Sequence, residues 1–185
     1  AEYHGDPDFY DVPIKQLLSK QYSKDLAEQI SGMRTPDGQI YEGDLKKYDE
    51  SPDTTHFSII DSKGNAVSNT YTLGSSFGSG VTIKKGGFLM NNQMRNFSHF
   101  YGRDDMQYGT SEANKLEPGK RMISTQTPTL VFDPKGDLFM ILGSPGGGRI
   151  PNIITQVITN VIDHEMSFTE AVIAPRINQR LEGNL

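Results

Sequence analysis

Alternation of apolar and polar residues predicts two β-strands in the middle of the chain. Residues 55–60 form the first, and within residues 65–73 Val67, Tyr71 and Leu73 alternate with polar residues. The segment between them, DSKGN, has the composition of a tight turn. We therefore expect an antiparallel hairpin.

This hairpin should bring two threonines together. A turn centred on Lys63 places Thr72 opposite Thr54. Directly opposed residues project to the same side with Cβ atoms roughly 5 Å apart, so two hydroxyl groups should meet at the end of the hairpin. A register shifted by one residue would turn one of them away.

A second hairpin and a further short strand are predicted downstream. Residues 129–132 and 138–142 are apolar runs joined by the turn sequence DPKG. Residues 87–90 form a short strand that leads into the motif NNQMRNF. Strands followed by helices indicate an α+β layered fold.

Apolar residues spaced three and four apart predict four helices. Ser23 is the expected N-cap of the second helix and Gly32 its end. Pro151 opens the third helix, and Ser167 with Glu170 forms a capping box for the fourth, which stops at Pro175. The apolar faces of the first three consist of Ile14, Leu17 and Leu18; of Leu26, Ile30 and Met33; and of Ile154, Val157, Ile158, Val161 and Ile162.

Two polar stretches are predicted to be irregular. Residues 33–53 form a long loop, where proteolytic processing is sterically easy, and residues 98–120 form an excursion that we expect to be mobile. The 185 residues are enough for one compact domain, or for a domain with a long appendage.

The composition narrows the classes of function. Cysteine is absent, which excludes disulfides and a thiolate nucleophile. The net charge is −5, with 12 acidic against 6 basic residues before position 54 and 11 against 12 from there on. A chain without a basic stripe is a poor nucleic-acid binder, because phosphate neutralisation dominates such affinity. No apolar run is long enough to span a membrane.

The histidines do not indicate a metal site. His4, His56, His99 and His164 lack the spacing of metal ligands, so each is expected to be hydrogen-bonded or solvated. We predict neither a metal nor another cofactor. The chain starts without Met and without a signal-like segment, which indicates a piece of a longer protein.

The glycine-rich loop between the second hairpin and the third helix has three interpretations. Gly143 and Gly148 have the spacing of a nucleotide-binding P-loop, but Arg149 and Ile150 stand where Lys and Ser or Thr are needed. The loop can equally be a plain turn at a helix entry. It can also present backbone N–H groups to an oxyanion.

Threonine is the remaining candidate nucleophile. The sequence offers no arrangement typical of a serine or cysteine triad. A threonine can use its own α-amino group as the base once it becomes N-terminal.

Four ordered motifs carry a resemblance to a known family: TTHFSIID, NNQMRNF, KRMISTQTPT and GSPGGGRI. In this order and spacing the chain resembles the γ-glutamyltranspeptidase family of N-terminal nucleophile hydrolases. The segment GDPDF at residues 5–9 also resembles the sequence that precedes the family's processing site. The resemblance covers nearly the whole chain.

The resemblance implies self-cleavage between Asp53 and Thr54. Residues 1–53 would then be the C-terminal tail of a large subunit, and residues 54–185 the N-terminal part of a small catalytic subunit. The implied fold is an αββα sandwich, present here in part. The implied partners are the rest of both subunits, a γ-glutamyl substrate and a water or amine acceptor. The implied location is extracellular, at the cell surface or periplasmic.

The resemblance also assigns roles to individual residues. Thr54 is the nucleophile for both the cleavage and γ-glutamyl transfer, and Thr72 orients it. Gly146 and Gly147 supply the oxyanion hole. The α-amino and α-carboxylate groups of the γ-glutamyl unit would be held by Gln93, Asn96, Ser124 and Thr125.

Two departures from the family pattern bear on the substrate. Asn96 stands where the family usually has an aspartate, and Gly74 replaces a polar pocket residue. Losing the carboxylate should weaken selection for a free α-ammonium group. Two substrates are therefore alternatives to glutathione. One is poly-γ-glutamate, and the other is a glutaryl amide, the substrate of a cephalosporin-type acylase. A non-catalytic relative that only binds γ-glutamyl peptides is the remaining alternative.

Overall fold

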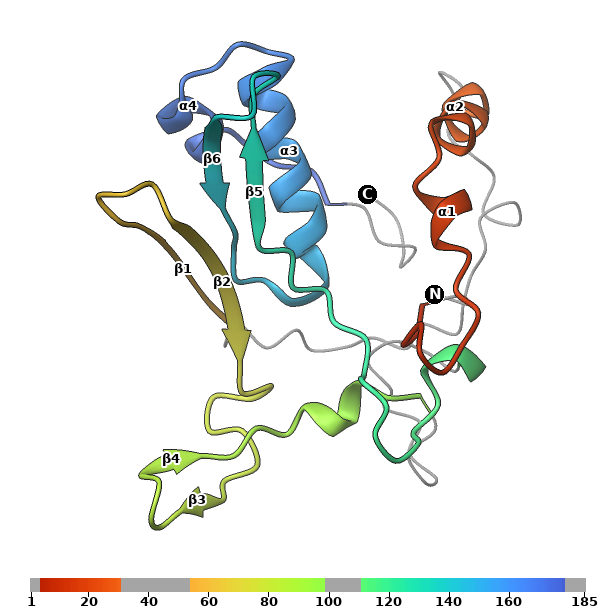
Figure 1. Cartoon of the computed structure of the whole chain (residues 1–185), viewed down its shortest axis with the longest axis vertical. Coiled ribbons are helices and arrows are strands. Elements are labelled where there is room, and N and C mark those ends of the chain that lie inside the picture. Colours follow the sequence, from red (N-terminus) through yellow and green to blue (C-terminus); the bar gives the residue numbers. More distant parts are fainter. Residues whose placement is uncertain (1–3, 31–53, 99–110, 179–185) are drawn as a thin grey trace. The chain divides into compact units, whose positions relative to one another are not determined.

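The computed structural model describes residues 4–30, 54–98 and 111–178, and the chain divides into two compact units (Figure 1). The described part of unit 1 comprises residues 4–30, 94–98 and 111–123. The described part of unit 2 comprises residues 54–93 and 124–178. No helix in these described ranges is both long and apolar enough to cross a membrane.

The first hairpin of unit 2 has the predicted register. Strand β1 (Thr54–Ile60) pairs antiparallel with β2 (Ala66–Thr72), and Thr54 lies opposite Thr72. The turn is held by Asp61, whose Oδ1 accepts the backbone N–H groups of Lys63 and Asn65, each at 2.9 Å. These local bonds determine where the chain reverses, and therefore which residues face each other.

The second hairpin repeats this construction. Strand β5 (Thr129–Phe132) pairs with β6 (Leu138–Leu142), with an irregularity between Val131 and Phe132. Asp133 Oδ1 accepts the N–H groups of Lys135 and Asp137 at 2.8 and 2.9 Å. Both predicted hairpins are confirmed.

Ser68 joins the two hairpins. Its hydroxyl donates to the Leu142 carbonyl at 3.0 Å and accepts the Thr129 N–H at 3.1 Å. Strand β2 therefore lies against the end of β6 and the start of β5. This contact brings the strand that carries Thr72 close to the loop that follows β6.

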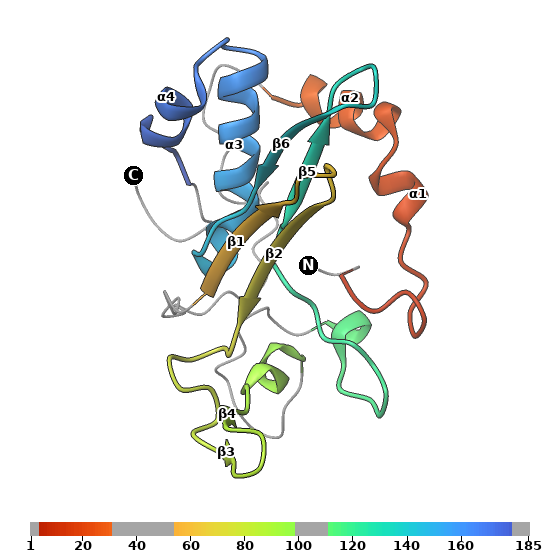
Figure 2. The same ribbon diagram turned by 60° about the vertical axis from the view of Figure 1, so that its left-hand side comes forward.

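Two helices complete unit 2. Helix α3 (Ile150–Ile162) lies alongside the β5–β6 hairpin and buries Ile150 and Ile154 (Figure 2). Helix α4 (Phe168–Ile173) has Ser167 as its N-cap, and the predicted capping box is present. Ser167 Oγ accepts the Glu170 N–H, and the Glu170 carboxylate accepts the Ser167 N–H. The Ser167 hydroxyl also donates to the Glu170 carboxylate at 2.7 Å, and this bond, together with that of the Ser167 N–H, lowers the pKa of Glu170.

A small hairpin was only half predicted. Strand β4 (Phe88–Leu89) lies within the predicted segment 87–90, and it pairs with β3 (Thr82–Ile83), which the sequence pattern did not indicate. Two-residue strands are too short to show an alternation.

In unit 1, one predicted cap is wrong. Helix α1 spans Ile14–Leu17 and α2 spans Lys20–Glu28. The N-cap of α2 is Ser19 rather than Ser23, because Ser19 Oγ accepts the Tyr22 N–H at 3.1 Å. Ser23 lies inside the helix and donates to the Ser19 carbonyl. Gly32 and Met33 lie outside the described residues.

The rest of unit 1 is built from short turns. The 3-10 helix η2 (Gln93–Asn96) leads into it from unit 2, and η3 (Glu112–Asn114) lies near its centre. Ala113 and Asn114 are fully buried. Ser111 and Lys120 are buried as well, so these four residues anchor the segment 111–120, which was predicted to be a mobile excursion. Residues 99–110 and the predicted loop 33–53 lie outside the described residues.

Candidate active site

Thr54 and Thr72 form the terminal pair of the β1–β2 hairpin, and both are half-buried. The Thr72 Oγ1 accepts the Gly74 N–H at 3.0 Å. A hydroxyl that accepts one hydrogen bond can donate its proton in another. The geometry suits a hydroxyl that donates a hydrogen bond to a neighbouring oxygen.

Gln93 lies beside this pair. Its side chain is buried and donates from Nε2 to the Thr72 carbonyl at 3.5 Å. The Asn91 side chain accepts the Gln93 N–H at 3.0 Å, which holds the start of η2. One predicted substrate-binding residue is thereby brought to the strand end that carries the two threonines.

Position 74 has no room for a side chain. Its φ angle is +94°, in the left-handed region, and a Cβ atom there would lie 2.0 Å from Asn92 Oδ1. Asn92 is held by its N–H on the Leu73 carbonyl and by its Nδ2 on Ser75 Oγ, both at 2.9 Å. The amide of Asn92 thus occupies the space of a side chain at position 74.

The glycine loop turns sharply before α3. Gly146 has φ +132° and Gly147 has φ +54°, so both lie in conformations that side chains disfavour. A 3-10 turn, η4 (Gly147–Arg149), then leads directly into α3. Successive N–H groups at the start of a 13-residue helix form a concave set of donors that can hold an anionic oxygen.

Thr125 is tied to this loop. Its Oγ1 donates to the Gly147 carbonyl at 3.0 Å. The adjacent Ser124 is exposed, and its Oγ accepts the Gln126 N–H at 3.2 Å. The structure therefore brings Thr125, a predicted substrate-binding residue, to the glycine loop.

His56 contributes a contact that the sequence did not reveal. Its Nδ1 lies 2.7 Å from Thr70 Oγ1 and its Nε2 lies 3.0 Å from Ser58 Oγ. The ring packs on Gly143, where a Cβ atom would lie 2.1 Å from Nδ1. Burial lowers the pKa of His56 and favours the neutral ring.

His56 was predicted to be a hydrogen-bonded histidine, and this is confirmed. The sequence did not predict that its ring lies between strand β1 and Gly143, the first residue of the glycine loop. The sequence could have indicated that His56 lies near the site, because side chains two residues apart, such as those of Thr54 and His56, lie on the same face of a strand. Among the described residues, no group of three or more acidic or histidine side chains could hold a metal ion.

Asn96 belongs to unit 1. It is buried, and its Nδ2 donates to the Ile123 carbonyl at 3.5 Å. Its own carbonyl accepts the Asn114 Nδ2 at 2.6 Å. Asp53, the predicted upstream side of the cleaved bond, lies outside the described residues.

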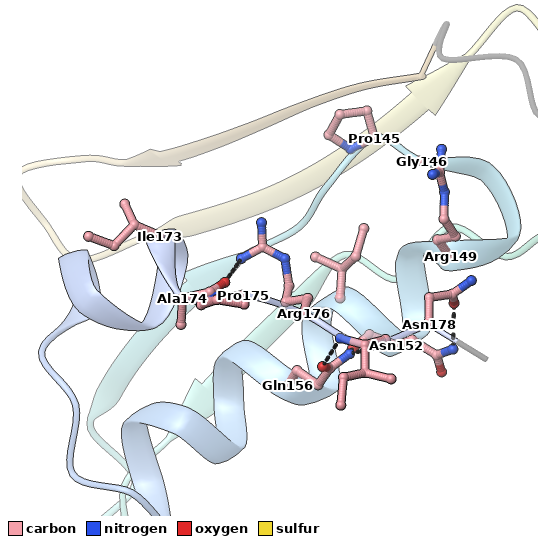
Figure 3. Close-up of a pocket in the computed structure, with 12 residues that line it drawn as sticks. Pro145, Gly146, Arg149, Asn152, Gln156, Ile173, Ala174, Pro175, Arg176 and Asn178 are labelled. Carbon is pink, nitrogen blue, oxygen red and sulfur yellow. Dashed lines mark hydrogen bonds between the residues drawn. The ribbon is translucent and has the colours of Figure 1, made fainter. Parts of the chain in front are cut away.

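A cavity of about 510 Å³ lies on the α3 side of the glycine loop (Figure 3). Gly146 and Arg149 line one part of it, and the segment 173–178 lines another. Gln156 holds that segment, because its Oε1 accepts the Ile177 N–H at 2.8 Å. Neither threonine of the terminal pair lines this cavity.

Comparison with known proteins identifies the family. The sequence profile described as gamma-glutamyltranspeptidase matches residues 1–184. The glutathione hydrolase proenzyme of Escherichia coli (strain K12) is 42% identical over 183 residues, covering 97% of this chain and 31% of that protein. The acylase ACY 1 proenzyme of Pseudomonas sp. (strain SE83) is 36% identical over 173 residues, covering 94% of this chain and 28% of that protein.

A solved structure agrees with this assignment. The γ-glutamyltranspeptidase of Pseudomonas nitroreducens complexed with L-DON has a TM-score of 0.62 and 48% identity, over 69% of this chain and 66% of that chain. The present chain belongs to the γ-glutamyltranspeptidase family. It spans less than a third of the length of these two curated relatives.

The Gly74 environment yields a stability prediction. Gly74→Ala should cost roughly 1–2 kcal/mol for the left-handed backbone, plus about 1–3 kcal/mol because the new methyl collides with the Asn92 amide. Gly64→Ala is the matched control, since Gly64 has φ +84° but nothing within 4 Å of its added Cβ. Chemical denaturation of both variants measures the difference, and equal losses would contradict the collision.

Proposed function

We propose that the protein transfers or hydrolyses γ-glutamyl groups through a threonine acyl-enzyme, after cutting itself between Asp53 and Thr54. The observation that carries the proposal is the pairing of Thr54 with Thr72 at a strand end, in a chain that matches the family throughout. Relatives named as proenzymes support a processing step.

The cut follows from the chemistry of the Thr54 hydroxyl. The Oγ attacks the Asp53 carbonyl carbon, the C–N bond breaks, and an ester replaces the peptide bond as the nitrogen takes up the proton. Water then hydrolyses the ester, which releases the upstream carboxylate and regenerates the hydroxyl. Thr54 now carries a free α-amino group that can serve as its base.

The same hydroxyl acts on substrate. Thr54 Oγ attacks the γ-carbonyl carbon and passes its proton to the α-amino group. The leaving amine departs with that proton, and an ester of Thr54 remains. Water or an acceptor amine attacks this ester by the reverse sequence and frees the hydroxyl.

Two groups assist these steps. The Thr72 hydroxyl, with a lone pair engaged by the Gly74 N–H, donates its proton toward Thr54 Oγ. The N–H groups of Gly146 and Gly147 stabilise the oxyanion of each tetrahedral intermediate. Both residues have a positive φ angle, which glycine adopts more readily than any other residue.

The substrate class depends on the groups that hold the γ-glutamyl unit. We assign Gln93, Asn96, Ser124 and Thr125 to this role. Asn96 is a neutral amide, so it offers no charge to pair with a free α-ammonium group. Poly-γ-glutamate and glutaryl amides therefore join glutathione as proposed substrates. Because the chain is similar to an acylase, we propose the cleavage of glutaryl amides as the second candidate function.

The same proposal accounts for an uncovered surface. Phe57, Ile59, Val67 and Tyr71 lie on the face of β1–β2 opposite Thr54 and are exposed. An αββα sandwich would cover such a face with a further layer. We propose that parts of the large and small subunits outside these 185 residues supply this layer. Residues 1–53 would belong to the large subunit and residues 54–185 to the small subunit.

We also propose that the enzyme works outside the cytoplasm.

Mass spectrometry of the full-length protein tests the cut. The wild type should yield two pieces separated between Asp53 and Thr54, and Thr54→Ala should remain intact because it lacks the attacking oxygen. Thr55→Ala, one residue away, is the control and should still be cut. Cleavage of Thr54→Ala at the same bond would contradict the assignment.

A second prediction concerns Thr72. Thr72→Val keeps the shape of the side chain and removes its proton donor, so kcat for a γ-glutamyl anilide should fall by roughly 100-fold. Thr72→Ser restores the donor and should recover most of the rate. The measurement uses enzyme shown to be cut, and unchanged kcat in Thr72→Val would contradict the role.

A third prediction concerns substrate choice. Asn96→Asp restores a carboxylate, so the ratio of kcat/KM for a γ-glutamyl anilide to that for a glutaryl anilide should rise by about 10- to 100-fold, about 1–3 kcal/mol. The two anilides differ only in the α-amino group, so each variant serves as its own control. An unchanged ratio would show that residue 96 does not read this group.

A further inference from the structure

Residues 5–9 are anchored in unit 1 by a buried carboxylate. The Asp6 side chain is only 1% exposed and accepts the backbone N–H of Arg121 at 2.8 Å and the Arg121 Nε at 2.9 Å. The Arg121 Nη2 donates to the other Asp6 oxygen, and also to Asp8 at 2.5 Å. Both carboxylate oxygens of Asp6 thus accept hydrogen bonds from Arg121, more than 100 residues away in the sequence.

The hydrogen bonds from the Arg121 side chain hold the pKa of Asp6 well below its ordinary value. The depressed pKa means that the pair contributes to stability above the ordinary aspartate range. That contribution is lost only as the pH falls into strong acid. Asp6 therefore stays ionised across the whole neutral range.

Close packing surrounds this ion pair. A Cβ atom at Gly5 would lie 2.2 Å from the Ala113 carbonyl oxygen, and Ala113 is fully buried. The ammonium of Lys120, also buried, binds Glu117 at 2.9 Å and lies 5.8 Å from the centre of the Phe9 ring. In contrast, α1 and α2, which follow, bury none of their own residues.

The two sides of this contact lie on opposite sides of the proposed cut. Gly5 and Asp6 precede the Asp53–Thr54 bond, whereas Ala113 and Arg121 follow it. All of these residues are more than 40 positions away from that bond in the sequence. Unit 1 is therefore assembled from both products of the cleavage.

We propose that Asp6 and Arg121, with the Gly5–Ala113 contact, form a latch that holds the two cleavage products together. This inference rests on the proposed self-cleavage. A covalent chain keeps its halves at high effective concentration, and cleavage removes that advantage. After the cut, the hydrogen bonds from Arg121 to the buried Asp6 carboxylate supply the attraction. The loss of Arg121 would leave that carboxylate buried without these donors.

The latch also braces a predicted substrate residue. Asn114, next to Ala113, donates to the Asn96 carbonyl at 2.6 Å and accepts the Ile123 N–H at 3.1 Å. Gly5 packs against the carbonyl oxygen of Ala113, the residue before Asn114. Loosening the latch should therefore raise KM more than it lowers kcat.

The test compares Asp6→Asn with Asp8→Asn in the full-length protein after cleavage. Both carboxylates bind the same guanidinium, but Asp8 is 73% exposed, so its pair should contribute little. Size-exclusion chromatography at increasing urea follows the separation of the two pieces. We expect the dissociation constant of Asp6→Asn to rise by about 10-fold or more, and that of Asp8→Asn to match the wild type.

The outcomes separate the latch from the proposed function. An uncut wild type would overturn the self-cleavage and the latch with it. A cut Asp6→Asn protein whose pieces separate at wild-type urea would overturn the latch alone. Hydrogen exchange of the cut wild type needs no variant: slow exchange of the Arg121 amide supports the latch, and exchange as fast as in the released small piece overturns it.

Discussion

The register of the β1–β2 hairpin is the constraint on which the rest of the site depends. Because side chains alternate between the faces of a strand, a slip of one residue would move Thr54 away from Thr72. The Asp61 carboxylate prevents this by holding two N–H groups of the turn. The same register places His56 opposite Thr70 and Ser58 opposite Ser68. One face of the hairpin thereby carries both the proposed chemistry and the contacts to the second hairpin.

Close backbone approach is the second requirement of unit 2. Gly143 leaves room for the His56 ring, and Gly74 leaves room for the Asn92 amide. Ser68 bonds to both strands of the second hairpin. The glycine loop is therefore held from the side of β1 by packing and from the side of Thr125 by a hydrogen bond. Donors for an oxyanion must be held in place before the reaction, and these contacts provide that rigidity.

Unit 1 illustrates a different use of charge. The Asp6 carboxylate is buried and accepts several hydrogen bonds from Arg121, whose own side chain is largely exposed, whereas both partners of the Lys115–Glu112 ion pair are exposed. A buried carboxylate depends on its hydrogen-bond donors, since water cannot replace them, whereas solvent screens a fully exposed pair. The segment GDPDF thus has a structural explanation in residues 5–9 themselves, in addition to its place in the family pattern.

The sequence by itself determined the local elements and the family. Both long hairpins, the register of Thr54 with Thr72 and the capping box at Ser167 follow from turn chemistry and alternation within about 20 residues, which local physics controls. The tertiary structure alone decided the contact of His56 with Gly143, the burial of Ala113 and Asn114, and the Asp6–Arg121 pair. Contacts across tens of residues leave no period in the sequence, because they depend on which surfaces meet after folding.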